Sequence, residues 1–202
     1  MLVIDKPLNS ELETILNDFS DRFFKKNLFN VKINGSPDTN EYYTSIEYLS
    51  SINKTKHIGY PEVCYGVDLT QTNSTSIDFR DELLKLDRGL NAYFNSKFCA
   101  VKMYYPENGY MGWHDNHNCP GYNILVSYNR TGQGFFRYID PVSNEVITLN
   151  DVCGWNAKIG YFGSETEYDK RIWHCARAYS PRLTLGFVIP DKEMWEMMVD
   201  DL

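Results

Sequence analysis

The chain has 202 residues, a length that suits one domain with a sizeable buried core. Hydrophobic residues make up 43% of it and charged residues 23%, which predicts a globular, soluble protein and excludes a disordered one. The 27 acidic residues outnumber the 20 basic ones and give a net charge of −7, so long-range attraction for phosphate backbones is absent. We expect no general nucleic-acid binding, although an enzyme with a local basic cleft is compatible with this charge.

Membrane and export signals are missing from the sequence. No apolar run reaches membrane-spanning length, and the first residues lack the basic-then-apolar order of a signal peptide. The cysteines are odd in number and form no Cys-x-x-Cys pair, which is typical of reduced thiols. We therefore expect a cytoplasmic protein without a membrane segment.

Two amphipathic helices are predicted in the first half of the chain. Ser10 and Glu13 resemble a capping box, and apolar residues then recur at helical spacing over residues 10–26. A second apolar stripe covers residues 77–95, and we expect both stripes to pack on the core. Residues 31–75 are polar and irregular, so we expect the substrate-facing loops there.

The pattern changes after residue 96. Short runs rich in β-branched and aromatic residues alternate with turn residues, and no βαβ alternation is present, which favours a jelly-roll sandwich. The predicted fold class is α+β in a single domain, residues 1–202. Helical support and variable loops occupy residues 1–95, the jelly-roll core 96–190 and a C-terminal helix 191–202. The predicted strands are residues 98–105, 122–128, 134–139, 145–149, 157–162 and 183–189.

Two polar clusters each place a histidine directly after a tryptophan. They span residues 111–121 and 172–187, and their histidines are His114 and His174. Imidazole is the commonest metal ligand near neutral pH. On neighbouring strands of a jelly roll, two such histidines can meet at one ion, so the clusters predict a metal site.

The residues after His114 supply a third candidate ligand. Side chains alternate across a strand, so His114 and Asn116 should face one side and Asp115 the other. A pair at i and i+2 with a distant histidine has the spacing of the two-histidine, one-carboxylate triad. That triad holds non-haem Fe(II) on one face and leaves three positions open.

Arg182 begins the last strong strand, and Thr184 is expected on the same face of it. An arginine fork beside a hydroxyl suits a carboxylate, because two parallel N–H···O bonds fix the plane of that group. A dicarboxylate such as 2-oxoglutarate is a fitting ligand, bound to iron at one end and to Arg182 at the other. Tyr104, on the strand that leads to the histidine cluster, is a candidate for a further hydroxyl.

The order of these features resembles that of the Fe(II)/2-oxoglutarate-dependent dioxygenases. A strand, Trp-His-x-Asn, aromatic strands, a turn at Gly154, a Tyr-Phe-Gly strand, Trp-His and Arg-x-Thr follow one another over about residues 98–190. The likeness is strongest to small single-domain members, including phage-type ones, and extends to the AlkB-like and prolyl-hydroxylase-like branches. It implies a double-stranded β-helix core and an oxygenase that couples decarboxylation of 2-oxoglutarate, with O2, to C–H hydroxylation of an unidentified substrate.

The resemblance also implies roles for individual residues. His114 and His174 would bind Fe(II) as the first and the distal ligand. Arg182 would pair with the far carboxylate of 2-oxoglutarate, with Thr184 and Tyr104 assisting. The tryptophans before the two histidines would form framework beside the metal.

One position departs from the family pattern of His-x-Asp or His-x-Glu. Asn116 stands where the carboxylate ligand is expected, directly after Asp115. Asn116 would coordinate through its amide oxygen, a bulge would turn Asp115 inward, or the position would be open as in related halogenases. The alternatives to an active hydroxylase are accordingly a catalytically impaired 2-oxoglutarate-binding module and a halogenase-like enzyme.

Two other assignments compete with the iron site. His114, His117, Cys119 and His174 would together supply a zinc site, although His-x2-His-x-Cys is not a usual zinc spacing. Arg177 is an alternative to Arg182 as the carboxylate clamp, but its neighbourhood has the composition of a loop.

Overall fold

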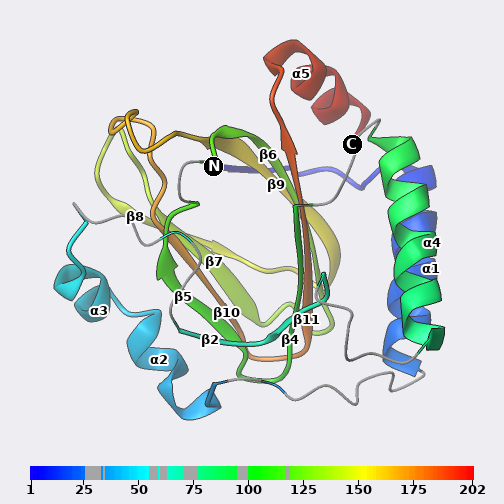
Figure 1. Cartoon of the computed structure of the whole chain (residues 1–202), viewed down its shortest axis with the longest axis horizontal. Coiled ribbons are helices and arrows are strands. Elements are labelled where there is room, and N and C mark those ends of the chain that lie inside the picture. The colour runs from blue at the N-terminus through cyan, green and yellow to red at the C-terminus, as the bar shows by residue number, and fades with distance from the viewer. Residues whose placement is uncertain are drawn as a thin grey trace.

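Two antiparallel β-sheets lie face to face, and helices cover their outer sides (Figure 1). The result is a mixed α/β structure with a jelly-roll-like pair of sheets, in agreement with the strand-rich pattern after residue 96. The structure is a computed structural model, and it describes residues 1–25, 33, 35–54, 59, 63–70, 77–94, 100–116 and 119–202.

The larger sheet separates an apolar face from a face that lines the space between the sheets. On its central strand, Ile124 and Val126 belong to the helix-facing core, whereas Leu125 and Ser127 face the other sheet. This is the period-two alternation expected of a strand. Across the described part of the sheet the order is β1 (Leu2–Val3), β9 (Gly154–Phe162), β6 (Gly121–Asn129), β11 (Arg182–Ile189), β4 (Val101–Tyr105) and β3 (Val67–Asp68).

The smaller sheet carries both histidines of interest. His114 is the last residue of β5, and His174 is the first residue of β10, its antiparallel neighbour. The six strand runs predicted from the sequence do not include these two segments. The expectation that the two histidines lie on neighbouring strands is nevertheless confirmed. The described order is β2 (Cys64–Tyr65), β5 (Tyr110–His114), β10 (His174–Ala178), β7 (Gly134–Ile139) and β8 (Val146–Asn150).

Both predicted amphipathic helices are present and pack on the outer face of the larger sheet (Figure 1). The ring of Phe94, directly after the second helix, lies 4.4 Å from that of Phe187 on β11 between ring centroids. The strand that carries Arg182 and Thr184 is thereby fixed from behind. The helices are α1 (Ser10–Lys25), α4 (Ile77–Tyr93) and the C-terminal α5 (Lys192–Asp201).

The start of α1 differs from the predicted capping box at Ser10. The side chain of Asn9 accepts a hydrogen bond from the N–H of Glu11 at 2.9 Å, and the Asn9 carbonyl accepts one from the N–H of Glu13 at 2.8 Å. Asn9 therefore caps the helix, and Ser10 is its first helical residue. Asparagine and serine are both favoured caps, so sequence alone did not separate the two positions.

Part of the segment expected to be irregular is helical and covers the outer face of the smaller sheet. The indole Nε1 of Trp113 donates to the carbonyl of Ser45 at 2.8 Å, and Nη1 of Arg137 donates to that of Thr44 at 2.9 Å. Trp113, the residue before His114, thus attaches the segment around Ser45 to the smaller sheet. The described helices are η1 (Pro37–Thr39), α2 (Asn40–Tyr43) and α3 (Ile46–Ser51).

None of the helices in the described part of the chain combines the length and the apolar character that a membrane crossing requires.

The helix-facing core predicts a large stability cost for one truncation. Phe187→Ala removes a fully buried ring and should lower the free energy of unfolding by about 3–5 kcal/mol, measured by urea denaturation. Leu84→Ala on α4 is the control, because its side chain is 51% exposed and its loss should cost under about 0.5 kcal/mol. Equal losses for the two variants would contradict the assigned packing.

Candidate functional site

A register shift brings the two histidines onto one face of the smaller sheet. His174 pairs with His114 and Ala176 pairs with Met111, so β5 holds one residue more than β10 between these pairs. An extra residue of this kind re-aims the side chains that follow it. Met111 and His114 therefore both line the cavity, although strict alternation would put them on opposite faces. The imidazole centroids lie 4.1 Å apart.

Backbone carbonyls fix the orientation of both imidazoles. Nδ1 of His114 lies 2.8 Å from the Gly112 carbonyl oxygen, and Nδ1 of His174 lies 3.0 Å from the Ile172 carbonyl oxygen. A carbonyl only accepts, so each Nδ1 carries the proton and each Nε2 keeps its lone pair. A hydrogen bond of this type is the usual outer support of a metal-binding histidine.

Burial keeps the two imidazoles neutral. Desolvation lowers the pKa of His114 to about 4, and it lowers the pKa of His174 well below its ordinary value, with the neighbouring His114 adding to the effect. Metal binding needs the unprotonated ring. In the metal-free protein both rings are ready to act as ligands at neutral pH, and the chemistry of this donor set fits a divalent transition metal.

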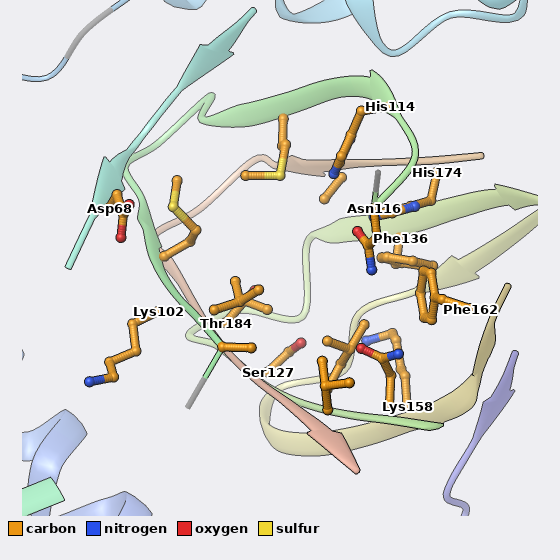
Figure 2. Close-up of a pocket in the computed structure, with 18 of the residues that line it drawn as sticks. Asp68, Lys102, His114, Asn116, Ser127, Phe136, Lys158, Phe162, His174 and Thr184 are labelled. Carbon is orange, nitrogen blue, oxygen red and sulfur yellow. The ribbon is translucent and has the colours of Figure 1, made fainter. Parts of the chain in front are cut away.

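Asn116 and Asp115 both line the cavity but have different contacts. The amide of Asn116 points into the part of the cavity that the two imidazoles face (Figure 2). Asp115 is 1% exposed, and its Oδ2 forms an ion pair with Nε of Arg171 at 2.8 Å. Its Oδ1 accepts a hydrogen bond from the N–H of Gly59 at 3.1 Å. Both oxygens of the carboxylate beside His114 therefore have protein partners.

The described residues contain no group of three His, Cys, Asp or Glu side chains arranged to hold a metal. The competing zinc assignment has little support within them: Cys119 lines the cavity and is exposed, whereas His117 lies outside the described residues. Cys175 points away from His174, because its thiol donates to the Thr44 carbonyl at 3.8 Å on the outer side of the sheet. The side chains that meet at this end of the cavity include the imidazoles of His114 and His174 and the amide of Asn116.

A cavity of about 350 Å³ extends from the histidines to the inner face of the larger sheet. Figure 2 shows His114, His174 and Asn116 at one end, and Lys158, Ser127 and Thr184 along the opposite wall. The intervening walls are largely apolar, which excludes water and strengthens the charge interactions inside. Apolar side chains that line the cavity include Met103, Met111, Leu125, Phe136, Phe162 and Val188.

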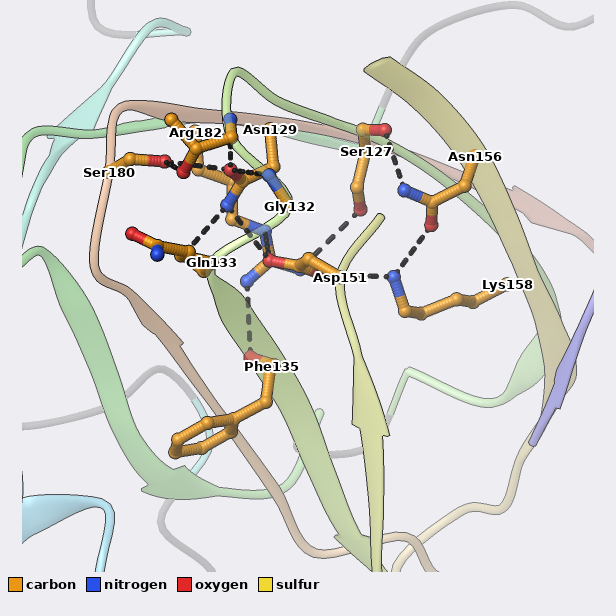
Figure 3. A network of polar contacts seen from close by, with 11 residues as sticks. Ser127, Asn129, Gly132, Gln133, Phe135, Asp151, Asn156, Lys158, Ser180 and Arg182 are labelled. Carbon is orange, nitrogen blue, oxygen red and sulfur yellow. Dashed lines mark hydrogen bonds and ion pairs between the residues drawn. The ribbon is translucent and has the colours of Figure 1, made fainter. Parts of the chain in front are cut away.

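The wall opposite the histidines contains a buried ionic network (Figure 3). Asp151 forms ion pairs with Nε of Arg182 and with Nζ of Lys158, each at 3.3 Å. Lys158 also donates to Oδ1 of Asn156 at 2.7 Å. Arg182 and Lys158 are each 1% exposed and both line the cavity. Two cations share one carboxylate, so one positive charge is left for an anionic ligand.

Lys158 is a site residue for which the sequence left two interpretations, an edge residue or part of a substrate-binding mouth. Desolvation, with the charge of Arg182, lowers the pKa of its ammonium group to about 8. A lysine inside the apolar run of residues 157–162 was the available signal, but an edge residue and a cavity residue give the same pattern. The structure decides, because β9 is an interior strand of the larger sheet and Lys158 is on its cavity face.

Thr184 supplies a hydroxyl that no other described group satisfies. It lines the cavity two residues after Arg182, is 8% exposed, and its Oγ1 has no hydrogen-bond partner. A buried hydroxyl without a partner costs free energy unless a ligand or water bonds to it. The expected pairing of Arg182 and Thr184 on one face is therefore present.

Tyr104 is not brought to the site. Its ring packs against Phe23 and Phe24 of α1, at centroid distances of 5.3 and 6.3 Å, on the helix-facing side of β4. Its neighbour Tyr105 faces the cavity, with the Arg182 guanidinium 5.6 Å from its ring centroid. Arg177, the alternative clamp, lies over the ring of Tyr179 at 4.7 Å and is not a lining residue.

No protein-family model matches the chain, and no curated protein matches it. Among solved structures, the chain is similar to the crystal structure of a Pseudomonas putida prolyl-4-hydroxylase, with a TM-score of 0.37 and 12% sequence identity, over 88% of this chain and 86% of that one.

The shared counter-ion predicts an asymmetric response to mutation. Asp151→Asn should lower the free energy of unfolding by about 3–5 kcal/mol, because it leaves two buried cations facing each other. Lys158→Met should cost clearly less, since Asp151 then still neutralises Arg182. Chemical denaturation at pH 7 measures both. A cost for Lys158→Met as large as that for Asp151→Asn would contradict the shared pairing.

Proposed function

We propose that this protein is a non-haem Fe(II)/2-oxoglutarate-dependent oxygenase with a double-stranded β-helix core. The observation that carries the proposal is the pair of neutral, carbonyl-oriented imidazoles of His114 and His174, which face a cationic wall across one largely apolar cavity. The overall reaction consumes 2-oxoglutarate and O2 and yields succinate, CO2 and a hydroxylated product.

The histidine end of the cavity is the proposed metal site. His114 and His174 would hold Fe(II) through Nε2, and the Asn116 amide oxygen is the third donor that best fits the surroundings. When bound, the iron with 2-oxoglutarate supplies the O2 activation that C–H oxidation requires. A neutral amide in place of a carboxylate leaves the centre one positive charge higher and should weaken iron affinity.

The opposite wall is the proposed site of the far carboxylate of 2-oxoglutarate. Arg182 presents its guanidinium, Thr184 its unpartnered hydroxyl and Lys158 its ammonium group to the same part of the cavity. Asp151 holds both cations in place and so orients the carboxylate indirectly. Met103, Phe136 and the other apolar lining residues shield the reacting end from water.

Spectroscopy and product analysis test the proposal. Anaerobic addition of Fe(II) and 2-oxoglutarate should produce the weak visible charge-transfer band of such complexes, and O2 should then yield succinate even without a known substrate. His174→Gln should abolish both signals, because it removes a metal donor. Arg182→Met should raise the apparent KM for 2-oxoglutarate by at least about tenfold, since a charge-assisted contact is lost.

Arg130→Met is the matched control for Arg182→Met, because Arg130 is exposed and lies outside the cavity. It should leave the band and the rate of succinate formation unchanged. Absence of both the band and succinate in the wild-type protein would reject the oxygenase.

Asn116 favours one alternative function, a module that binds 2-oxoglutarate without turnover. The described residues contain no group of three His, Cys, Asp or Glu side chains placed to hold a metal, and the carboxylate of Asp115, beside His114, is paired with Arg171. In this case 2-oxoglutarate would raise the melting temperature of the wild type but not of Arg182→Met, and neither protein would form succinate. Turnover that depends on His174 would exclude this alternative.

The lowered pKa of Lys158 predicts the pH dependence of 2-oxoglutarate binding. Below about pH 8 the ammonium group is charged and attracts the carboxylate; above its pKa of about 8 the group becomes neutral and the attraction is lost. Affinity, measured by calorimetry, should fall by up to about tenfold between pH 8 and pH 9. Lys158→Met should bind more weakly at pH 7 and show a flat profile. A flat wild-type profile would remove Lys158 from the ligand site.

A further inference from the structure

The β5–β10 ladder ends at the two histidines. His114 closes β5 and His174 opens β10, and the register shift lies directly before this last pair. Strand ends fray, and a shift interrupts the ladder bonds that would hold them. Strand β7 holds His174 from its other side, where Tyr138 pairs with it and the N–H of Ile139 donates to the Trp173 carbonyl. The spacing of the two imidazoles therefore depends on what holds the end of β5 against the start of β10.

An ion pair provides that support on the open side of the ladder. Asp115 follows His114, Arg171 precedes His174 by three residues, and their Oδ2 and Nε atoms are 2.8 Å apart. Both side chains are buried, at 2% and 9% exposure. At this burial a charge pair resists separation far more than it would on the surface, because a lone buried charge is costly.

The pair is itself fixed by contacts with two further residues. Oδ1 of Asp115 accepts the N–H of Gly59, and Nη1 of Arg171 donates to the Lys54 carbonyl at 3.5 Å. The Arg171 guanidinium also lies 5.9 Å from the ring centroid of Trp173, the residue before His174. Asp115 thus lies next to His114 and Arg171 lies close before His174. Each also has a hydrogen bond to a residue outside β5 and β10.

We propose that Asp115 and Arg171 are positioning residues that clasp the two strand ends and set the distance between the metal-binding histidines. Asp115 acts through His114 and Asn116 and is not itself a ligand. The proposal rests on the proposed metal site. It explains why an aspartate follows His114 while a neutral amide occupies the ligand position: the carboxylate holds the strand ends together through Arg171. Loss of a group that positions metal ligands typically costs about 10- to 100-fold in metal affinity.

Co(II) titration of the full chain, followed by its visible absorption, tests the clasp without requiring turnover. Asp115→Asn and Arg171→Met should each weaken Co(II) binding by about 10- to 100-fold. The double variant should bind about as weakly as either single variant, because the pair acts as a unit. Arg171→Lys, which retains the charge, should recover part of the affinity.

The outcomes separate a clasp from a ligand. If Asp115 coordinates the metal, Arg171→Met will bind Co(II) at least as tightly as the wild type while Asp115→Asn loses binding, and the proposal is overturned. Unchanged affinity in both single variants overturns it too. If the wild-type protein binds no Co(II), the proposed metal site is rejected, and with it both the clasp and the proposed function.

A matched control distinguishes positioning from general stability. Arg22 and Glu82 form an ion pair at 2.6 Å between α1 and α4, away from the cavity. Arg22→Met should lower the melting temperature but leave the Co(II) affinity and spectrum of the folded protein unchanged. If Arg171→Met is too unstable to titrate, the Co(II) affinities of Arg171→Lys and of the double variant Asp115→Asn/Arg171→Met are compared with that of the wild type at low temperature. A loss of Co(II) affinity in Arg22→Met equal to that in Arg171→Met would overturn the clasp.

Discussion

His174 lies opposite His114 in the β5–β10 ladder, and one extra residue in β5 turns both rings into the same cavity. The histidine end of the candidate site depends on this pairing. The carbonyls of Gly112 and Ile172, each two residues before a histidine, then hold Nδ1 and leave Nε2 toward the cavity. Burial removes the competing proton, so backbone geometry and desolvation together prepare the rings as ligands.

The opposite wall of the cavity buries two like charges, those of Arg182 and Lys158. Arg182 and Lys158 are almost fully buried, and the structure tolerates them because Asp151 lies between the two. Asn156 and Ser127 provide further polar partners, the latter accepting from Nη2 of Arg182 at 3.5 Å. The network is one negative charge short of neutrality, which suits the binding of a carboxylate.

The tryptophans beside the histidines stabilise the site from outside. Alternation along the strands directs Trp113 and Trp173 away from the cavity, into a small core under α3 that also contains Leu49 and Phe135. The tryptophan-histidine repeat in the sequence therefore reflects the two faces of the smaller sheet. The histidines face the cavity and the tryptophans face the covering helices.

The sequence by itself determined the features that depend on local periodicity. It predicted both long amphipathic helices, the strand at residues 134–139, and the alternation that sets Arg182 and Thr184 side by side. It also singled out His114 and His174, because paired tryptophan-histidine sequences are rare enough to be noticed. These properties are fixed by side-chain order along one element.

Only the tertiary structure decided the properties that depend on strand register and on which sheet face is covered. The shift in β5, the rotation of Tyr104 toward α1, the pairing of Asp115 with Arg171 and the inward position of Lys158 all follow from contacts between segments distant in sequence. A one-residue change of register reverses the face of every following side chain, and no pattern within a single strand reveals it.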